Sequence, residues 1–295
     1  MRQTEHLRCI NKDSPGEACL LCGARDYFVV TSQPRRIVQC KNCSFIYASP
    51  RPSQQELSHY YSEAQTSTHS IDRRLIERGV AQRLKYLQKV VDFSRRQSIL
   101  DIGCDDGTFL SLLGSRYEHL NLFGVEPSQQ RAKLAKTLPK LNIRAETFEE
   151  VHFERTFDII AAIHVLEHLY DPIGFLNKVK SIMHPESLLF IEVPTVSLSR
   201  LDLPCGIRLL APGYRHSEHL WFFTKQTLRH LLERQGFHIR AIKCVNLGVQ
   251  PKVNSLVMRY LPWLFPLYEL VSEVVMFPFN AIGRGLQVMA IANKA

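Results

Sequence analysis

The sequence predicts an α/β protein with a mostly parallel sheet, preceded by a small β-rich module that contains four cysteines. From residue 98 onward, short β-branched or aromatic runs alternate with amphipathic stretches bounded by capping residues, as in consecutive β-α-β units. Two Cys-x-x-Cys pairs lie within the first 43 residues. The 295 residues, 45% of them hydrophobic, are enough for one large core and a small accessory module.

The N-terminal module is expected over residues 1–48. Its two cysteine pairs are separated by seventeen residues, and the stretch between them, YFVVTSQPRRIVQ, favours a β-hairpin. Four thiolates at this spacing are typical of a structural zinc site, which leaves no open coordination position for a substrate. We therefore expect a zinc ribbon in which the ligands are Cys19, Cys22, Cys40 and Cys43.

Composition indicates where the protein works and what it contacts. The first residues lack the apolar core of a signal peptide, so we expect a cytoplasmic protein whose cysteines bind metal rather than form disulfides. The formal charge of +9 would suit an anionic partner such as nucleic acid. However, the densest clusters of lysine and arginine are mere pairs, which favours an ordinary solvated surface.

Residues 49–97 are expected to form a linker and a helical cap. Two prolines in ASPRPSQQEL interrupt regular structure directly after the module. Apolar residues then recur at roughly helical spacing, at Leu75, Val80, Leu84, Leu87 and Val90. We expect this helix to pack across the entrance of the domain that follows.

The main domain is expected over residues 98–295, with seven strands and four helices. The runs that favour strands are 98–103, 121–126, 141–145, 157–165, 187–193, 237–245 and 285–292. The stretches that favour helices are 107–116, 127–140, 171–183 and 224–236, the last closed by Gly236. Right-handed crossovers between such strands produce a parallel sheet covered by helices on both faces.

An apolar insert interrupts this domain between about residues 250 and 283. Glu269, Glu273 and the prolines at 262, 266 and 278 break it up, whereas a membrane-spanning helix needs about 20 mostly apolar residues. We therefore expect peripheral membrane contact, a substrate lid or a dimer contact rather than a membrane span.

A ligand site is expected where the first two strands of the main domain end. In ILDIGCDDGTFL, Gly103 and Gly107 allow the backbone to approach a ligand closely, and ligands of open α/β sheets bind at the carboxyl ends of the strands. The next strand ends at Glu126, 25 positions after Asp101. A carboxylate there can accept hydrogen bonds from both ribose hydroxyls of an adenosine ligand.

These motifs resemble the class I methyltransferases, in particular the bacterial group similar to the ubiquinone-biosynthesis O-methyltransferases. ILDIGCDDG resembles the first motif of that family, VEPS the second, FDIIAAIHVLEHLYDP the motif at the fourth strand, and HLWFFTKQTLRHLLERQGF a later stretch. The resemblance covers nearly all of residues 99–295. It implies a Rossmann-like seven-stranded sheet, mostly parallel, with an antiparallel last strand.

The resemblance further implies that the site binds S-adenosylmethionine. The residues that would border its methionine portion are Asp101, Gly103, Cys104, Asp105 and Gly107. The family usually has glycine at the position of Asp105, so we expect an altered turn. Cys104 could instead be a small buried residue that only fills the turn.

By the same resemblance, the ribose and adenine would contact residues that follow the second and third strands. Glu126 would bind the ribose, and Thr147 and Phe148 would lie beside the adenine. His164, which follows the fourth strand, would lie near the sulfonium.

The segment HVLEHL offers a second group of polar side chains. If a helix begins there, His164, Glu167 and His168 share one face. Some relatives bind a divalent metal with an ExxEH motif and a later histidine, for which His219 is favoured here over His216. Alternatively no second metal is bound, and His168 or His219 acts as the general base.

The sequence therefore predicts an S-adenosylmethionine-dependent methyltransferase. The resemblance favours O-methylation of a small-molecule, glycan or lipid-linked acceptor. Two alternatives are an RNA methyltransferase that binds nucleic acid through the ribbon, and a scaffold that binds the cofactor without catalysis.

Overall fold

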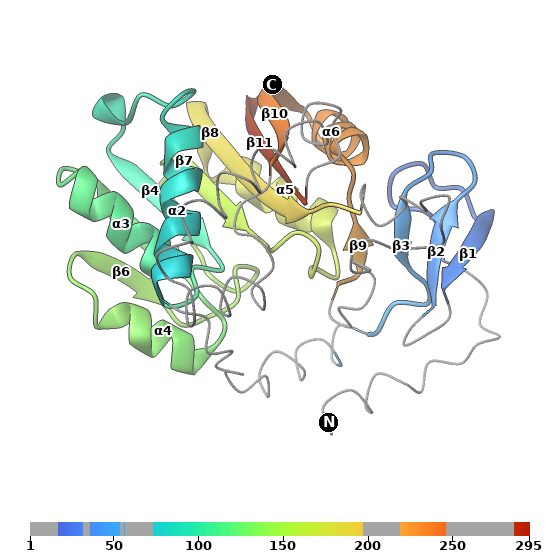
Figure 1. The fold of residues 1–295 in the computed structure, drawn as a ribbon, viewed down its shortest axis with the longest axis horizontal. Coiled ribbons are helices and arrows are strands. Elements are labelled where there is room, and N and C mark those ends of the chain that lie inside the picture. The colour runs from blue at the N-terminus through green and yellow to red at the C-terminus, as the bar shows by residue number, and fades with distance from the viewer. Residues whose placement is uncertain (1–16, 32–35, 54–55, 57–72, 197–218, 246–285) are drawn as a thin grey trace, which may run out of the picture.

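The computed structural model describes residues 17–31, 36–53, 56, 73–196, 219–245 and 286–295 (Figure 1). The apolar insert and His216 lie outside the described residues. The described chain forms two sheets, one of seven strands and one of four. No helix of the described segments is long and apolar enough to cross a membrane.

The seven-stranded sheet has the order β10-β11-β8-β7-β4-β5-β6. Its strands are β4 (Ser98–Ile102), β5 (Asn121–Val125), β6 (Leu141–Arg144), β7 (Phe157–Ile163), β8 (Met183–Pro194), β10 (Phe237–Val245) and β11 (Gln287–Lys294). β11 pairs antiparallel with both β8 and β10, whereas the pairs from β8 through to β6 are all parallel. This confirms the predicted Rossmann-like sheet with an antiparallel last strand.

Three of the described α-helices begin after a residue whose side chain caps them. The helices are α2 (Arg73–Leu87), α3 (Thr108–Arg116), α4 (Gln129–Lys136), α5 (Pro172–Ser181) and α6 (Lys225–Arg234), with a 3-10 turn η2 (Phe93–Arg95). Ser128, Asp171 and Thr224 each accept a hydrogen bond from a backbone amide of the first turn that follows. α2 ends at Leu87, so Val90 lies beyond the helix that its spacing suggested, and 38% of it is exposed.

Helices cover both faces of the large sheet because alternate residues of each strand point to opposite faces. Ile99 and Ile159 pack in one apolar cluster with residues of α2 and α3. Leu100 and Ile160 belong to a second cluster, which includes residues of α5 and α6. The carboxyl ends of the central strands are therefore the open edge where polar groups gather.

The four-stranded sheet contains the cysteine module and one strand from the distant main domain. Its antiparallel order is β1 (Tyr27–Thr31), β2 (Ile37–Cys40), β3 (Ile46–Ala48) and β9 (Trp221–Phe222). β1 and β2 form the predicted hairpin. β3 and β9 were not expected, and Figure 1 shows β9, in orange, between the large sheet and the blue module.

Aromatic side chains fill the interface between the module and β9. Phe45, Tyr47, Trp221 and Phe223 are all at most 1% exposed. The ring of Trp221 lies 6.0 Å from that of Phe45 and 6.2 Å from that of Tyr47, measured between centroids. Because these residues share one continuous core cluster with the large sheet, the module is packed onto the main domain.

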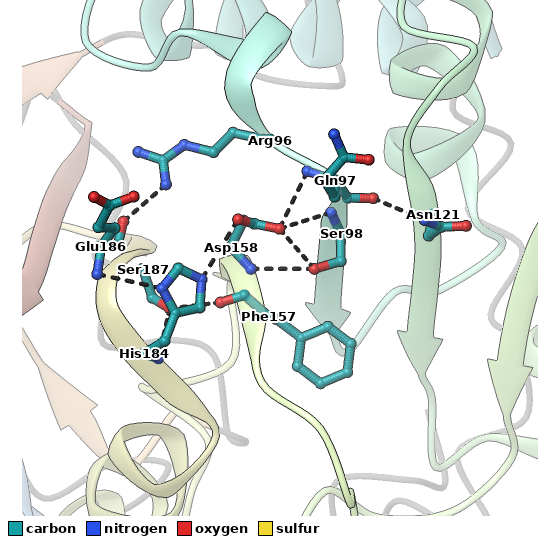
Figure 2. Close-up of polar contacts among 9 residues, drawn as sticks. All are labelled: Arg96, Gln97, Ser98, Asn121, Phe157, Asp158, His184, Glu186 and Ser187. Atoms are coloured by element: carbon teal, nitrogen blue, oxygen red, sulfur yellow. Dashed lines mark hydrogen bonds and ion pairs between the residues drawn. The ribbon is translucent and has the colours of Figure 1, made fainter.

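At the amino ends of the parallel strands, Asp158 organises a polar network (Figure 2). Its Oδ2 accepts hydrogen bonds from the backbone amides of Gln97 and Ser98 at 3.1 and 2.9 Å, and from the Ser98 hydroxyl at 2.8 Å. His184 Nε2 lies 3.4 Å from its Oδ1. Burial alone would raise the pKa of Asp158, but these hydrogen bonds outweigh it and lower that pKa. The network joins the starts of β4, β7 and β8.

Candidate functional site

The turn after β4 needs glycine at two positions. Gly103 has φ +73°, and a Cβ there would lie 2.7 Å from Cγ2 of Val165. Gly107 has φ +80° and precedes the first residue of α3. Only glycine adopts such backbone conformations without strain, so both residues leave the backbone open at the carboxyl edge of the sheet.

Asp105 has a backbone conformation that favours glycine, with a φ of +51°. The half-exposed carboxylate forms an ion pair with Arg131 of α4. Its backbone amide donates a hydrogen bond of 3.0 Å to Oε2 of Glu126.

Glu126 joins the ends of β4 and β5. It is only 7% exposed, and its Oε1 accepts a 2.9 Å hydrogen bond from the amide of Ser128 in addition to the bond from Asp105. The amide of Gly103 donates to the carbonyl of Val125 at 2.8 Å, which brings the two predicted motifs together. Burial raises the pKa of Glu126. A carboxylate has about four acceptor positions, so the two amides leave capacity for a ligand.

Asp101 contributes a buried carboxylate with a free acceptor. It is 2% exposed, and its Oδ1 has no hydrogen-bond partner. Burial, together with the nearby charge of Glu126, raises the pKa of Asp101 to about 8. An unpaired buried oxygen is costly, so a position that retains one is a candidate for contact with a ligand.

Of the other predicted cofactor contacts, Cys104 lies in the turn after β4, and Thr147 and Phe148 follow β6. Cys104 is 4% exposed, and a Cβ at Gly124 would lie 2.6 Å from its Sγ. Phe148 is 4% exposed and stacks edge-on against Phe175 with a centroid distance of 5.2 Å. The Thr147 hydroxyl donates to Glu150. The side chains of Cys104 and Phe148 therefore fill the core, which leaves their backbone atoms for a ligand.

His164 lies between two carboxylates that are fully buried. Its Nδ1 is 3.2 Å from Oε1 of Glu167, and its Nε2 is 3.1 Å from Oε1 of Glu192. The amide nitrogen of Gln287 lies 3.3 Å from the same Nε2. Burial alone would lower the pKa of His164. The hydrogen bonds to Glu167 and Glu192 outweigh this effect and raise the pKa to about 9. His164 is therefore an imidazolium at neutral pH.

The cap helix α2 contributes Arg83 to this group. Its Nε and Nη2 donate to the two carboxylate oxygens of Glu192, both at 2.7 Å. Arg83 and His164 together hold the pKa of Glu192 at about 2, against the effect of burial. Sequence reasoning missed Arg83, Glu192 and Gln287. A lone acid in the apolar run SLLFIEV was a signal for Glu192, but nothing distinguished Arg83 from its basic neighbours.

Glu167, His168 and His219 form a second convergence. Each can direct one ligand atom to within 4.8 Å of those of the other two. The rings of His168 and His219 meet edge-on at 4.7 Å between centroids, and Oε2 of Glu167 is buried without a partner. The segment that carries Glu167 is a turn, not the start of a helix, because His164 has φ +54° and α5 begins only at Pro172.

The four cysteines of the module also converge. Their sulfur atoms lie within 4.8 Å of one another, with 3.5 Å separating Cys19 from Cys43 and Cys22 from Cys40. A tetrahedral shell with Zn–S bonds of about 2.3 Å requires sulfur separations of about 3.8 Å, so the donor set fits zinc. Burial raises the pKa of Cys19 and of Cys43, the latter to about 11, so a cation is needed to stabilise their thiolates.

Comparison with known proteins relates this architecture to one family. A model of the methyltransferase domain family matches residues 69–242. The mitochondrial ubiquinone biosynthesis O-methyltransferase of Homo sapiens is 29% identical over 159 residues, which cover 49% of this chain and 42% of that protein. The ubiquinone biosynthesis O-methyltransferase of Bradyrhizobium diazoefficiens is 33% identical over 102 residues, covering 32% and 38%. The matches thus span about two fifths of these relatives.

A solved structure shares the fold at lower identity. It was assigned to an S-adenosylmethionine-dependent methyltransferase of Listeria monocytogenes, and it is 16% identical to this chain with a TM-score of 0.51. The likeness covers 74% of this chain and 99% of that one. It shows that the two chains share a fold.

Proposed function

Because the chain belongs to the methyltransferase domain family, we propose that it transfers a methyl group from S-adenosylmethionine to a small-molecule, glycan or lipid-linked acceptor, by O-methylation. The observation that carries this proposal is the junction of Gly103 and Glu126 at the carboxyl ends of β4 and β5. Backbone amides already orient the Glu126 carboxylate there, and Asp101, near the end of β4, keeps an unpaired oxygen. These groups suit a ligand with ribose hydroxyls and an ammonium group.

The cofactor would lie along this edge. Glu126 would accept hydrogen bonds from the ribose, and the backbone of Thr147 and Phe148 would border the adenine. The turn Asp101, Gly103, Cys104, Asp105 and Gly107 would surround the methionine portion. When bound, S-adenosylmethionine supplies a sulfonium methyl group that is open to in-line displacement. His164 would lie near that end, with its own positive charge offset by Glu167 and Glu192.

The acceptor would approach from the side of Glu167, His168 and His219. A neutral imidazole at His168 or His219 would take the hydroxyl proton as the methyl group transfers. Alignment of the acceptor oxygen contributes more to such a displacement than proton removal does. We therefore assign the positioning of the acceptor to this trio.

The trio also supports a second use, because its ligand atoms lie close enough together to hold one divalent cation. A histidine bound to metal cannot act as the base, so the two uses are exclusive. Metal analysis of Glu167→Gln separates them. If wild type and variant both contain only the metal of the ribbon, the trio holds no cation and the general base is the supported use. If the variant contains less metal than wild type, the trio binds a cation.

The domains that we propose are the zinc ribbon at 1–48, the linker and cap at 49–97, and the methyltransferase domain at 98–295. The ribbon would hold zinc through Cys19, Cys22, Cys40 and Cys43, as their sulfur separations support. Zinc with four thiolate ligands has no open position and would be structural.

Calorimetry with S-adenosylhomocysteine tests the cofactor site. We expect wild type to bind it, and Glu126→Gln to bind about tenfold to a hundredfold more weakly, because hydrogen bonds to a charged acceptor contribute about 1.5–3 kcal/mol. Glu146→Gln is the matched control, an exposed acid just after β6 on the same edge. Equal affinity in all three proteins, or none in wild type, would contradict the proposal. A panel of acceptors with labelled cofactor then identifies the substrate class.

A further inference from the structure

The two-residue strand β9 is held by two different parts of the molecule. On one side, Trp221 and Phe222 pair with Tyr47 and Ile46 of the ribbon strand β3, and the amide of Ala48 donates to the carbonyl of Leu220 at 2.8 Å. Just after β9, Phe223 forms a parallel bridge with Thr195, beyond the end of β8. β9 therefore connects the ribbon to the carboxyl edge of the large sheet.

The same short strand holds the acceptor side of the site. The amides of Leu220 and Trp221 both donate to the carbonyl of Glu167, at 2.8 and 3.2 Å. The indole nitrogen of Trp221 donates to the carbonyl of Leu169 at 2.7 Å. These bonds fix the turn that carries Glu167 and His168, while His219 directly precedes the anchored residues.

The cofactor side is connected differently. Glu126, Gly103 and Asp105 are joined through hydrogen bonds among β4, β5 and the turn between them. β9 contacts β3, the end of β8 and the turn after β7. A disturbance of β9 should therefore reach Glu167, His168 and His219 before it reaches Glu126.

From this connectivity we propose that the zinc ribbon positions the acceptor trio, with Trp221 as the positioning residue, and leaves the Glu126 end of the cofactor site unaffected. The inference rests on the proposed function. A strand of two residues cannot hold its own register, so it depends on its neighbour β3. β3 has three residues and begins three residues after Cys43, and Phe45 between them stacks on Trp221. Zinc that closes the cysteine cluster thus fixes the strand against which β9 pairs.

Nuclear magnetic resonance of histidine-labelled protein tests this assignment. The imidazole resonances of His168 and His219 are assigned with H168Q and H219Q, and S-adenosylhomocysteine affinity is measured in parallel. In Cys43→Ser, and in wild type treated with a zinc chelator, we expect both resonances to move. The Kd for S-adenosylhomocysteine should change by less than about twofold, because the hydrogen bonds that hold Glu126 come from Asp105 and Ser128 and not from β9.

Phe28→Leu is the matched control. Phe28 is 60% exposed on β1, in the same module but away from β9, so its replacement should move neither signal. If Cys43→Ser does not fold, Phe45→Leu weakens the stack on Trp221 with all four cysteines intact and should shift the same resonances. Unchanged resonances after zinc loss would overturn the inference, and so would a parallel loss of cofactor affinity in folded protein. Failure of wild type to bind S-adenosylhomocysteine would instead count against the proposed function.

Discussion

Each end of the large sheet carries an aspartate, and the surroundings of the two carboxyl groups are opposite in kind. At the amino end, Asp158 of β7 accepts three hydrogen bonds and has a lowered pKa. At the carboxyl end, Asp101 of the neighbouring β4 keeps an unpaired oxygen and has a raised pKa. An acid whose partners all lie in the protein stabilises the fold, whereas a buried acid with an unpaired oxygen is a candidate for contact with a ligand. The comparison therefore predicts a structural role for Asp158 and supports the proposed ligand contact of Asp101.

The largest expected effect is at Asp101. The pKa of its carboxyl is about 8 in the folded protein and about 3.9 in the unfolded chain. The contribution of this group to the free energy of unfolding is therefore fully present below pH 3.9 and is lost as the pH rises toward 8. Asn is neutral throughout this range. The free energy of unfolding of Asp101→Asn should therefore exceed that of wild type by an amount that grows by up to about 1.4 kcal/mol for each pH unit. Urea unfolding of the cofactor-free protein from pH 5 to pH 8 measures the difference.

If the difference in free energy of unfolding between variant and wild type does not change with pH, the comparison fails. That result would mean that Asp101 is already ionised in the folded protein and that its charge is balanced by its neighbours. The same variant should bind S-adenosylhomocysteine more weakly. Weaker binding would distinguish an acid that contacts the ligand from one that only destabilises the fold.

The next effect is at the ion pair between the cap helix and the sheet. Arg83→Met leaves Glu192 fully buried with only His164 as a charged partner, and breaking a buried pair in this way costs about 3 kcal/mol. Thermal or urea unfolding at pH 7 measures the loss. Lys85→Met, an exposed change on the same helix, is the control and should stay within about 0.5 kcal/mol. If Arg83→Met/Glu192→Gln is no more stable than Arg83→Met, the pair is not the source of the cost.

Replacement of the other aspartate should have the opposite sign. Asp158→Asn removes the charge that three donors stabilise, which we expect to cost about 2 kcal/mol at pH 7. Because the folded pKa is lowered, this contribution is present above pH 3.9 and disappears as the pH falls through the lowered value. Unfolding at pH 7 and pH 3 gives the trend. A stabilised Asp158→Asn at neutral pH would refute the distinction between the two ends.

The smallest effect is expected at Asp105. Asp105→Gly relieves a left-handed backbone but removes a half-exposed ion pair with Arg131, and each contribution is below about 1 kcal/mol. We expect a net change within about 0.5 kcal/mol, measured by urea unfolding at pH 7. A larger loss would show that the Asp105 side chain, and not only its backbone, supports the turn.

Periodic elements of the fold could be predicted from sequence, and short ones could not. The seven strands of the large sheet and the helices α3 to α6 follow from apolar runs and amphipathic stretches, because a regular repeat is visible over four or more residues. β3 and β9 have three and two residues, too few for any repeat. They form because strands distant in sequence provide hydrogen-bond partners and a shared aromatic core.

The site divides in the same way. Spacing along the chain pointed to the two strand ends that Gly103 and Glu126 occupy, and the structure joins them. The contribution of Arg83 depends on where α2 crosses the sheet, which no local pattern encodes. No helix begins at HVLEHL, where His164 has φ +54°, so the shared helical face that was conditional on one is absent. The polar groups converge there through a turn instead.

The pairing of β3 with β9 also constrains the order of assembly. Residues 17–48 leave the ribosome long before Trp221 and Phe222, which are synthesised after the five parallel strands β4 to β8. The cysteine-rich module thus emerges first and completes its sheet late, across a gap of more than 170 residues between its paired strands. Such non-local pairing is slow to form. The module would stay incomplete on the nascent chain until much of its neighbour exists, so the two units mature as one.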